Sequence, residues 1–311
     1  MSQARILPYD ATAIAAAARL IAEGQPVAMP TETVYGLAAD ATDGQAVTSI
    51  YAAKGRPSFN PLIVHVLDRA AAEMLADLPD AARKLADAFW PGPLTIVAPL
   101  NPDAPIAALA TAGLPTIALR SPAHPAMRDL LRACGKPLAA PSANASGTIS
   151  PTRAEHVLRS LGSRIELIVD GGPTTVGLES TIVMVEGDHL RVLRPGPITA
   201  DQLAEASALP VIAGASDQIE APGQLAQHYA PSKPVRLNAA QAAQDEWLIG
   251  FGPIAGDVSL SAGGDLNEAA ARLFELLHQA DAGGAARIAF APVPDHGLGI
   301  AINDRLRRAA A

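Results

Sequence analysis

A stretch near the N-terminus places two cations, an amide and an imidazole around short apolar runs, with Gly and Pro at the turns. Lys54 and Arg56 flank Gly55, and the chain then passes through Asn60 into an apolar run that ends at His65. A glycine between two cations lets the backbone approach a polyphosphate while both side chains reach its oxygen atoms. The alternative is a solvated helix end, where Lys and Arg interact favourably with the helix dipole. The stretch is therefore a candidate site for a phosphate-bearing ligand and a small polar co-substrate.

His65 and Arg120 each end an apolar segment that we predict to be a strand. A single histidine is more often a buried structural residue than a ligand, and nothing at metal-ligand spacing accompanies His65, so the pattern argues against zinc. In open α/β sheets the strand ends border the ligand crevice, where an Arg can bind a carboxylate through two parallel hydrogen bonds. A surface ion pair would explain Arg120 equally well.

A polar loop with the sequence Ser-Ala-Asn-Ala-Ser-Gly follows another predicted strand at residues 142–147. If this loop is extended, Ser142 and Asn144 point the same way and offer a hydroxyl and an amide to phosphate or to water bound to Mg²⁺. An Asx or Ser turn that caps the next helix is the alternative. Farther along, Ser180 opens a predicted strand and Arg194 ends one, and ordinary strand termini would account for both.

Two glycine-containing segments do not fit nucleotide-binding motifs. Residues 250–256 read Gly-Phe-Gly-Pro-Ile-Ala-Gly, which has the wrong spacing for dinucleotide binding, contains Pro and lacks an acidic residue after a second strand. The segment Gly135-Lys-Pro lacks the upstream glycine and the Ser or Thr of a P-loop. We expect neither segment to bind a nucleotide.

The composition is typical of a globular protein. At 311 residues, with 49% hydrophobic and 17% charged residues, the chain is expected to divide into two domains. The longest apolar-rich stretch, near residues 104–117, contains Pro, Gly and Thr and is not a membrane span. The N-terminus lacks the features of a signal peptide, and the single cysteine, Cys134, cannot form an internal disulfide or a metal cluster. We therefore expect a cytoplasmic protein with no membrane partner.

The net charge of −8 argues against a wholly basic nucleic-acid-binding protein. The charge is unevenly distributed, at −2 for residues 1–195 and −6 for residues 196–311. The N-terminal part can therefore contain a basic cavity that the overall charge hides, whereas the acidity of the C-terminal part argues against direct docking of a nucleic acid there.

Short strands alternate with helices through residue 198, which predicts an α/β domain with a mixed sheet. Residues 199–234 are rich in Ala, Pro, Gly and Gln, and we predict a linker there. Residues 235–311 then form a small β-α-β-α unit. The predicted strands are 27–29, 62–66, 94–98, 116–119, 138–140, 167–169, 180–185, 190–193, 235–237, 247–250 and 287–291, and the predicted helices are 10–23, 43–53, 79–89, 122–133, 153–161, 265–279 and 303–310.

These segments together resemble the YrdC-like family of threonylcarbamoyl-AMP synthases, in the long form with a C-terminal extension. The segment His228-Tyr-Ala-Pro231 is similar to the linker of that long form. Other matches fall in order and cover nearly all of residues 5–198. They are PTETVYGLAADA at 30–41, KGRPSFNPLIVHV at 54–66, FWPGPLTIV at 89–97, TIALRSP at 116–122, APSANASG at 140–147, DGGPTTVGLEST at 170–181 and LRPGPI at 193–198.

The resemblance implies a twisted mixed sheet with flanking helices and a concave cavity over residues 1–198, a linker or lid over 199–234, and a small Rossmann-like domain over 235–311. It also implies a nucleotidyltransferase that makes threonylcarbamoyl-AMP and pyrophosphate from L-threonine, bicarbonate and ATP with Mg²⁺. The product serves N6-threonylcarbamoyladenosine formation at position 37 of tRNA. Further candidate partners are tRNA and the downstream threonylcarbamoyl-transferase.

The family's site residues carry over to matching positions of this chain, and no motif position departs from the family pattern. The catalytic set implied by the resemblance is Lys54, Arg56, Ser142 and Asn144. The threonine-binding set is Thr33, His65, Arg120, Ala140 and Ser180. The ATP-binding set is Lys54, Arg56, Asn60, Thr116, Ser142, Ser150, Arg194 and Tyr229, and no protein ligand for a metal is implied.

The implied chemistry needs no covalent enzyme nucleophile, which is consistent with the lack of a Cys-His or Ser-His-Asp pattern. Carbamates decarboxylate in water, so we expect the site to close during turnover, with Tyr229 at the tip of a lid. The alternative function is a non-catalytic module that binds double-stranded RNA in ribosome maturation, which salt-dependent RNA binding without threonine-dependent pyrophosphate release would favour. A carbamoyl-transfer maturation factor would need zinc-finger segments that one cysteine cannot supply.

Overall fold

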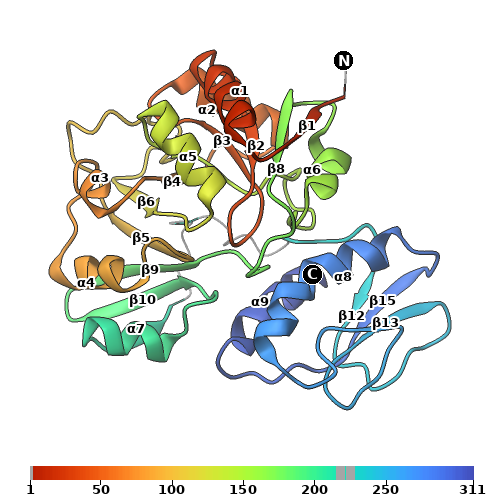
Figure 1. Ribbon diagram of the computed structural model, residues 1–311. Coiled ribbons are helices and arrows are strands. Elements are labelled where there is room, and N and C mark those ends of the chain that lie inside the picture. Colours follow the sequence, from red (N-terminus) through yellow and green to blue (C-terminus); the bar gives the residue numbers. More distant parts are fainter. Residues whose placement is uncertain (1–2, 215–220, 222–227) are drawn as a thin grey trace.

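The computed structural model describes residues 3–214, 221 and 228–311, which form two α/β domains that lie side by side (Figure 1). A mixed sheet runs through the larger domain in the order β1-β8-β2-β3-β7-β4-β6-β5-β9-β10-β11. Its strands are β1 (Arg5–Pro8), β2 (Val27–Met29), β3 (Gly36–Asp40), β4 (Ile63–His65), β5 (Leu94–Pro99), β6 (Thr116–Arg120), β7 (Leu138–Ala139), β8 (Leu167–Asp170), β9 (Thr181–Glu186), β10 (His189–Arg194) and β11 (Val211–Ala213).

Helices flank this sheet, as the sequence predicts. Several begin at an Asp whose carboxylate accepts a hydrogen bond from a first-turn N–H, as Asp10 does from Ala13 at 2.7 Å. The helices of the larger domain are α1 (Ala11–Ala22), α2 (Gly44–Lys54), α3 (Arg69–Glu73), α4 (Asp80–Phe89), α5 (Pro125–Cys134), α6 (Ala154–Leu161) and α7 (Ala200–Ser207).

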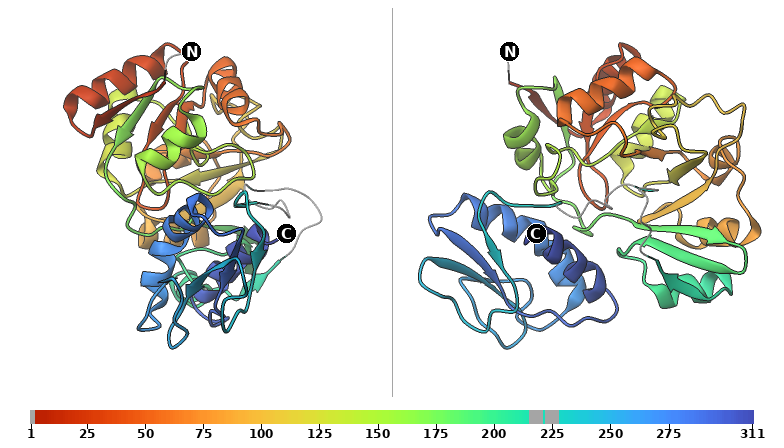
Figure 2. Two further views of the ribbon diagram at one scale, coloured as in Figure 1. Left: turned by 90° about the vertical axis from the view of Figure 1, so that its right-hand side faces the viewer. Right: turned by 180° about the vertical axis from the view of Figure 1, so that it is seen from behind.

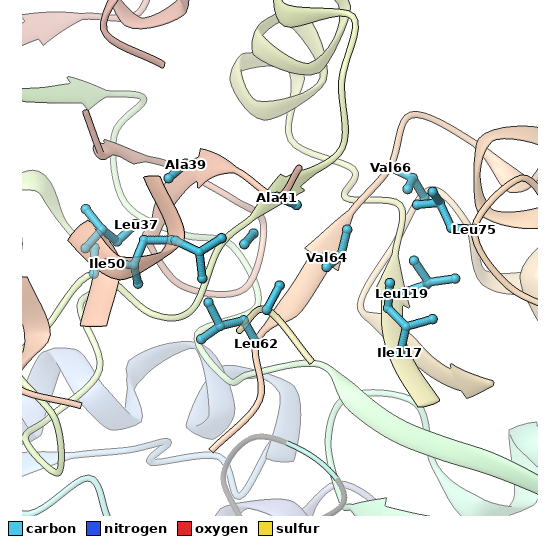
Figure 3. Packing of buried hydrophobic residues seen from close by; sticks show 14 of the residues in the cluster. Leu37, Ala39, Ala41, Ile50, Leu62, Val64, Val66, Leu75, Ile117 and Leu119 are labelled. Atoms are coloured by element: carbon cyan, nitrogen blue, oxygen red, sulfur yellow. The ribbon is translucent and has the colours of Figure 1, made fainter. Parts of the chain in front are cut away.

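Small aliphatic side chains build the core of the larger domain because the chain has few aromatic residues. On one face of the sheet, Leu37 packs with Ile50 of α2, and Leu62, Val64 and Leu119 continue the same cluster (Figure 3). Alanine dominates the packing between α1 and α5 on another part of the sheet, where it lets the two helices approach closely. The core therefore leaves the ends of β4 and β6 available for polar side chains.

Strand register brings the two chemistry-bearing strand ends together. β4 and β6 are parallel neighbours, and His65 is paired directly with Arg120. Side chains alternate along a strand, so Ile63 and His65 share one face with Ala118 and Arg120. Gly55, with φ of +61°, ends α2 in the left-handed conformation and turns the chain sharply between Lys54 and Arg56.

The linker is shorter than the sequence predicts. The residues after 198, which we predicted to be linker, form α7 and β11, and β11 adds a parallel strand to β10 of the large sheet. A capping box between Thr199 and Gln202 fixes the start of α7. The Ala- and Pro-rich composition obscures this short amphipathic helix, although the spacing of Thr and Gln is a recognisable start signal. The remainder of the predicted linker lies largely outside the described residues.

The smaller domain has a four-stranded, all-parallel sheet in the order β12-β15-β13-β14, with two helices packed on it. This arrangement confirms the prediction of a Rossmann-like α/β unit. Its elements are β12 (Val235–Arg236), β13 (Glu246–Gly250), β14 (Val258–Ser259), α8 (Leu266–Ala282), β15 (Arg287–Phe290) and α9 (Gly299–Ala309). None of the helices in the described residues has both the length and the apolar character that crossing a membrane requires.

Helices α8 and α9 face the larger domain (Figures 1 and 2). His278 of α8 donates a hydrogen bond to the carbonyl oxygen of Ser150 over 3.0 Å, and its ring stacks on that of His156 at 3.8 Å between centroids. Gly177 lies so close to α8 that an added Cβ would approach the backbone of Ala270 and Ala271 to 2.6 Å. Its φ of +73° also favours glycine. The two domains are therefore closely fitted along α8.

Candidate substrate-binding site

A small, largely enclosed cavity lies where β4, β6, the 140–142 loop and residues of the 228–229 segment meet. Its volume is only about 50 Å³. Two of the lining residues, His228 and Tyr229, precede the smaller domain and are buried. The residues that line the cavity are Thr33, Val34, Arg56, Ile63, His65, Arg120, Ala140, Pro141, Ser142, Glu179, Arg194, His228 and Tyr229. The structure thus gathers most of the residues that we predicted, from six separate parts of the chain.

Arg120 is the central cation at one end of this cavity. Its guanidinium donates to the Glu32 carboxylate over 2.6 Å and to the Thr33 hydroxyl over 3.0 Å. Glu32 in turn accepts hydrogen bonds from the backbone N–H groups of Ala123 and His124 at the start of α5. Glu32 therefore fixes the position of Arg120, and the sequence analysis assigned it no role.

The charge state of Glu32 follows from these partners. Burial by itself would raise the pKa of the Glu32 carboxyl, but the adjacent charge of Arg120 and the hydrogen bonds outweigh it, so the pKa lies below its ordinary value. Glu32 is thus a carboxylate at neutral pH, and its pairing with Arg120 is a buried ion pair.

His65 is neutral and has an unused ring nitrogen. Burial, reinforced by the nearby charge of Arg120, lowers the pKa of His65 to about 3. Its Nδ1 has no hydrogen-bond partner among the residues that the structure describes. A buried imidazole nitrogen without a partner is costly to keep, which indicates that it meets a polar group of a ligand.

Arg56 lines the cavity, and Lys54, two residues earlier in the chain, is buried without lining it. The ammonium of Lys54 donates to the carbonyl oxygens of Ser142 and Asn144, and the Arg56 guanidinium donates to those of Asn60 and Pro61. Neither cation contacts a carboxylate within residues 3–214, 221 and 228–311. Two adjacent cations without a carboxylate partner, of which Lys54 is buried and Arg56 partly buried, suit an anion with several oxygen atoms.

The pKa values of Lys54 and Arg56 are consistent with a site that binds an anion. Burial and then the charge of Arg56 lower the pKa of Lys54 well below its ordinary value. Burial also lowers the pKa of Arg56 to about 10. A bound polyanion would reverse both shifts by compensating the charges, so anion binding and protonation of Lys54 favour each other.

Ser142 and Asn144 lie next to Lys54, whose ammonium donates to both of their carbonyl oxygens. The Asn144 side chain donates to the carbonyl oxygen of Thr148 over 2.8 Å, which holds the loop in place. Its Oδ1 is buried and has no partner in the described part of the chain. Asn60 is 1% exposed, and both polar atoms of its side chain likewise have no partner in the described residues. These orphaned amides are available to a ligand.

Ser180 and Arg194 support one side of the cavity. Arg194 donates to the carbonyl oxygen of Ser180 over 2.9 Å and to its hydroxyl over 3.1 Å, and that hydroxyl also shares a hydrogen bond with Thr95. Arg194 lines the cavity, whereas Ser180 lies behind it. The prediction that Ser180 binds threonine stays a prediction.

A residue of the smaller domain reaches this site. Arg305 of α9, 1% exposed, donates from its Nε to Glu179 over 2.8 Å, and its guanidinium carbon lies 5.2 Å from the ring centroid of Tyr229. Ser150 donates its hydroxyl to the other oxygen of Glu179. Burial alone would raise the pKa of Glu179, but the charges of Arg305 and Arg194 hold it below its ordinary value.

Thr116 is the predicted site residue that lies farthest from this group. It stands at the opposite end of β6 from Arg120, paired with Pro99, and does not line the cavity. It nevertheless shares the sheet face of Ala118 and Arg120, because side chains alternate along the strand. Its predicted contact with ATP stays a prediction.

Within the described residues, no group of three or more His, Cys, Asp and Glu side chains is arranged to hold a metal ion. Glu179 is the carboxylate that lines the cavity in this part of the chain, and Ser150 and Arg305 engage its two oxygens. These residues suit Mg²⁺ only as an ion carried by the phosphates of a nucleotide substrate.

Fold and site together define an α/β protein with a buried, cation-rich cavity for a polyanion beside a smaller zwitterion or carboxylate. Comparison with known families agrees. A model of the Sua5, YciO and YrdC family, described as "Telomere recombination", matches residues 19–196, and a model described as "Threonylcarbamoyl-AMP synthase, C-terminal domain" matches residues 198–311. The chain belongs to this family and carries both of its domains.

Individual relatives extend over nearly the whole chain. The threonylcarbamoyl-AMP synthase of Bacillus subtilis is 43% identical, over 96% of this chain and 92% of the relative. The crystal structure of Pyrococcus abyssi Sua5 complexed with L-threonine superposes with a TM-score of 0.89 at 36% identity, over 98% of this chain and 97% of that one. The structure of Escherichia coli YciO shares the fold over 63% of this chain and 96% of its own length, with a TM-score of 0.55 and 22% identity.

The sequence analysis gave no role to three residues of the site. Glu32 and Glu179 lie inside segments that the resemblance covers, so the sequence shows their motifs. It does not show that they form ion pairs with Arg120 and Arg305. Arg305 is one of several basic residues in the last helix, and its sequence neighbourhood resembles an ordinary basic helix end. Only the packing of the two domains distinguishes it.

Proposed function

We propose that this protein is an L-threonylcarbamoyl-AMP synthase, which condenses L-threonine, bicarbonate and ATP and releases pyrophosphate. The observation that carries the proposal is the proximity of two cations, Lys54 and the cavity-lining Arg56, to a polar end of the same cavity that is formed by Thr33, His65 and Arg120. The product would serve threonylcarbamoyladenosine formation on tRNA, through a transferase that takes up the activated carbamoyl group.

The polar end of the cavity suits an amino acid. Arg120 can pair with the threonine carboxylate while Glu32 keeps its guanidinium in place. The free Nδ1 of His65 is left for a polar group of threonine. Such a grip would hold the amine toward the bicarbonate-derived carbon, so that a carbamate forms in place.

The cationic end suits the phosphates. The carbamate oxygen would attack the α-phosphorus of ATP, and pyrophosphate would leave with additional negative charge. Lys54 and Arg56 would stabilise that charge because both are already held in position by backbone carbonyls. Mg²⁺ would enter as part of the ATP substrate, bound to its phosphate oxygens.

An apolar patch on the same sheet face is a candidate site for the adenine ring. Ile63, Val97, Ala118, Ile182 and Leu193 form one buried cluster on neighbouring strands, next to His65 and Arg120. An apolar surface bordered by a few polar groups is typical of nucleotide sites. A nucleotide placed along this face would run toward Thr116, which supports the predicted contact.

The cavity of about 50 Å³ is too small for threonine and ATP together, so it has to open to admit them. Tyr229, fully buried with a φ of +64°, is the residue best placed to move as a lid. Closure would keep water from the carbamate. Replacing Tyr229 by Ala should increase ATP breakdown relative to threonylcarbamoyl-AMP formed, and an unchanged ratio would argue against the lid.

The decisive experiment measures pyrophosphate release with L-threonine, bicarbonate and ATP, and then leaves out each of the first two in turn. We expect release to need both, and the product to have the mass of threonylcarbamoyl-AMP. Release that continues without threonine or without bicarbonate would overturn the proposal.

A further inference from the structure

The smaller domain contains a cavity of its own, separate from the site above. It lies outside the carboxyl ends of β12 and β15, and its volume is about 250 Å³. In open parallel sheets this end of the strands is where ligands bind. The domain is also an addition to a fold that occurs without it, since E. coli YciO matches the larger domain over nearly its whole length. The smaller domain can therefore have a role apart from the condensation chemistry.

The cavity has an apolar floor and a polar rim. Leu237, Phe290 and Leu306 contribute apolar surface, and Phe290 and Leu306 are buried. Asn303 and Arg307 stand one turn apart on the same face of α9, so both reach the rim. Their spacing presents an amide and a guanidinium side by side.

The rim carries one charge of each sign. The Arg307 side chain has no ion-pair or hydrogen-bond partner among the described residues and is exposed. Asp295 stands on the opposite segment, where its carboxylate accepts a hydrogen bond from the Asn303 amide over 3.3 Å. Asn238, in the left-handed conformation at φ of +57°, completes the polar rim.

We propose that this cavity is a second ligand site, which binds a free α-amino acid. The Arg307 guanidinium would pair with the α-carboxylate, Asp295 would accept from the α-ammonium, and the apolar floor would contact the side chain. Charge and size both favour such a zwitterion. A nucleotide would bring at least two negative charges to a rim whose own charges cancel, and 250 Å³ is at the lower limit for drug-sized ligands but ample for an amino acid.

The test uses isothermal titration calorimetry on the full chain, with glycine, L-alanine, L-serine, L-threonine and L-asparagine as probes and no ATP present. We expect at least one of these five to bind at this site. Its affinity should fall at least about tenfold in Arg307→Ala and, separately, in Asp295→Asn, because each removes one charge-assisted contact. Arg272→Ala, an exposed arginine of α8 paired with Glu268, is the matched control and should bind normally.

Three outcomes would overturn the inference. They are the absence of any binding that the two variants weaken, binding of a probe other than L-threonine that survives in both variants, and a loss in Arg307→Ala without any loss in Asp295→Asn, which would describe a site for anions only. Acetate that binds as tightly as the amino acid would lead to the same conclusion. The measurement is independent of pyrophosphate release, so this inference can fail while the proposed synthase activity stands, and the reverse.

Discussion

The two cavities of this protein are built from opposite kinds of side chain. In the larger domain Lys54 is buried and Arg56 partly buried, and backbone carbonyls fix both, whereas Arg307 at the second cavity is exposed and has no partner in the described residues. A buried cation without a carboxylate partner lowers stability until an anion arrives, so it is retained only where a ligand supplies the charge. An exposed cation carries no such penalty. The energetics of the first cavity therefore favour a bound ligand. For the second cavity, only its shape and charge pattern indicate a ligand.

The largest expected effect concerns Lys54. Replacing Lys54 by Met removes the buried ammonium that positions the 142–144 loop and faces the phosphates. Pyrophosphate release should fall on the order of a thousandfold, the loss typical of a preorganised charge aimed at a developing anion. Lys84→Met on the exposed face of α4 is the control and should retain full activity. A Lys54 variant with activity within tenfold of wild type would contradict the assignment of the phosphate end.

Arg305 tests the connection between the two regions, because α9 carries both Arg305 and Arg307. Arg305→Met leaves Glu179 as a buried carboxylate without its partner, and the free energy of unfolding should fall by about 3 kcal/mol. Arg307→Met, two residues away on the exposed side, should leave it unchanged. Urea denaturation followed by circular dichroism measures both. The double variant Glu179→Gln with Arg305→Met should recover part of the loss, and no recovery would mean that the pair does not act as a unit.

A variant of Arg120 tests whether the two ends of the first cavity bind different substrates. Arg120→Lys keeps a positive charge beside Glu32 but loses the forked geometry that grips a carboxylate. We expect KM for threonine to rise by about one to two orders of magnitude while KM for ATP stays within a factor of about two. Steady-state kinetics with each substrate varied in turn provide the comparison. Equal increases in both KM values would show that the two ends are not distinct.

The smallest effect concerns the interface between the domains. Burial lowers the pKa of His278 to about 4, against the opposing hydrogen bond to Ser150, and burial also lowers the pKa of the stacked His156 to about 2. Because the unfolded chain takes up protons near pH 6.5 and the folded chain does not, stability is fully present above pH 6.5 and declines as the pH falls toward 4. His278 should account for roughly 1 kcal/mol of the loss between pH 6.5 and 5.5.

His278→Gln isolates this contribution, because the amide can still donate to Ser150 but does not titrate. The charged groups around the pair are Arg153, Arg159, Glu275 and Asp281. Melting temperatures are measured at half-unit steps of pH, and that of the wild type should fall more steeply with decreasing pH than that of the variant. Parallel curves would assign the acid sensitivity to other groups, such as His65 and His228.

The sequence was sufficient to predict most strands, the Rossmann-like C-terminal unit and most of the residues that line the first cavity. Its motifs place Lys54, Arg56 and Ser142 at turns whose geometry Gly and Pro determine locally. The sequence could not predict β11, whose partner β10 supplies the hydrogen bonds that make it a strand. Nor could it predict the pairing of Arg305 with Glu179, since 126 residues separate them and neither has a distinctive neighbourhood. Long-range partners depend on how two domains pack, and no local pattern encodes that.

Gly177 has a consequence for how the two domains can be combined. Any other residue there would place its Cβ within 2.6 Å of the α8 backbone and push the helix away. A chimeric protein that joins this C-terminal domain to the single-domain fold of another family member therefore needs a glycine at that loop position, besides a suitable tether.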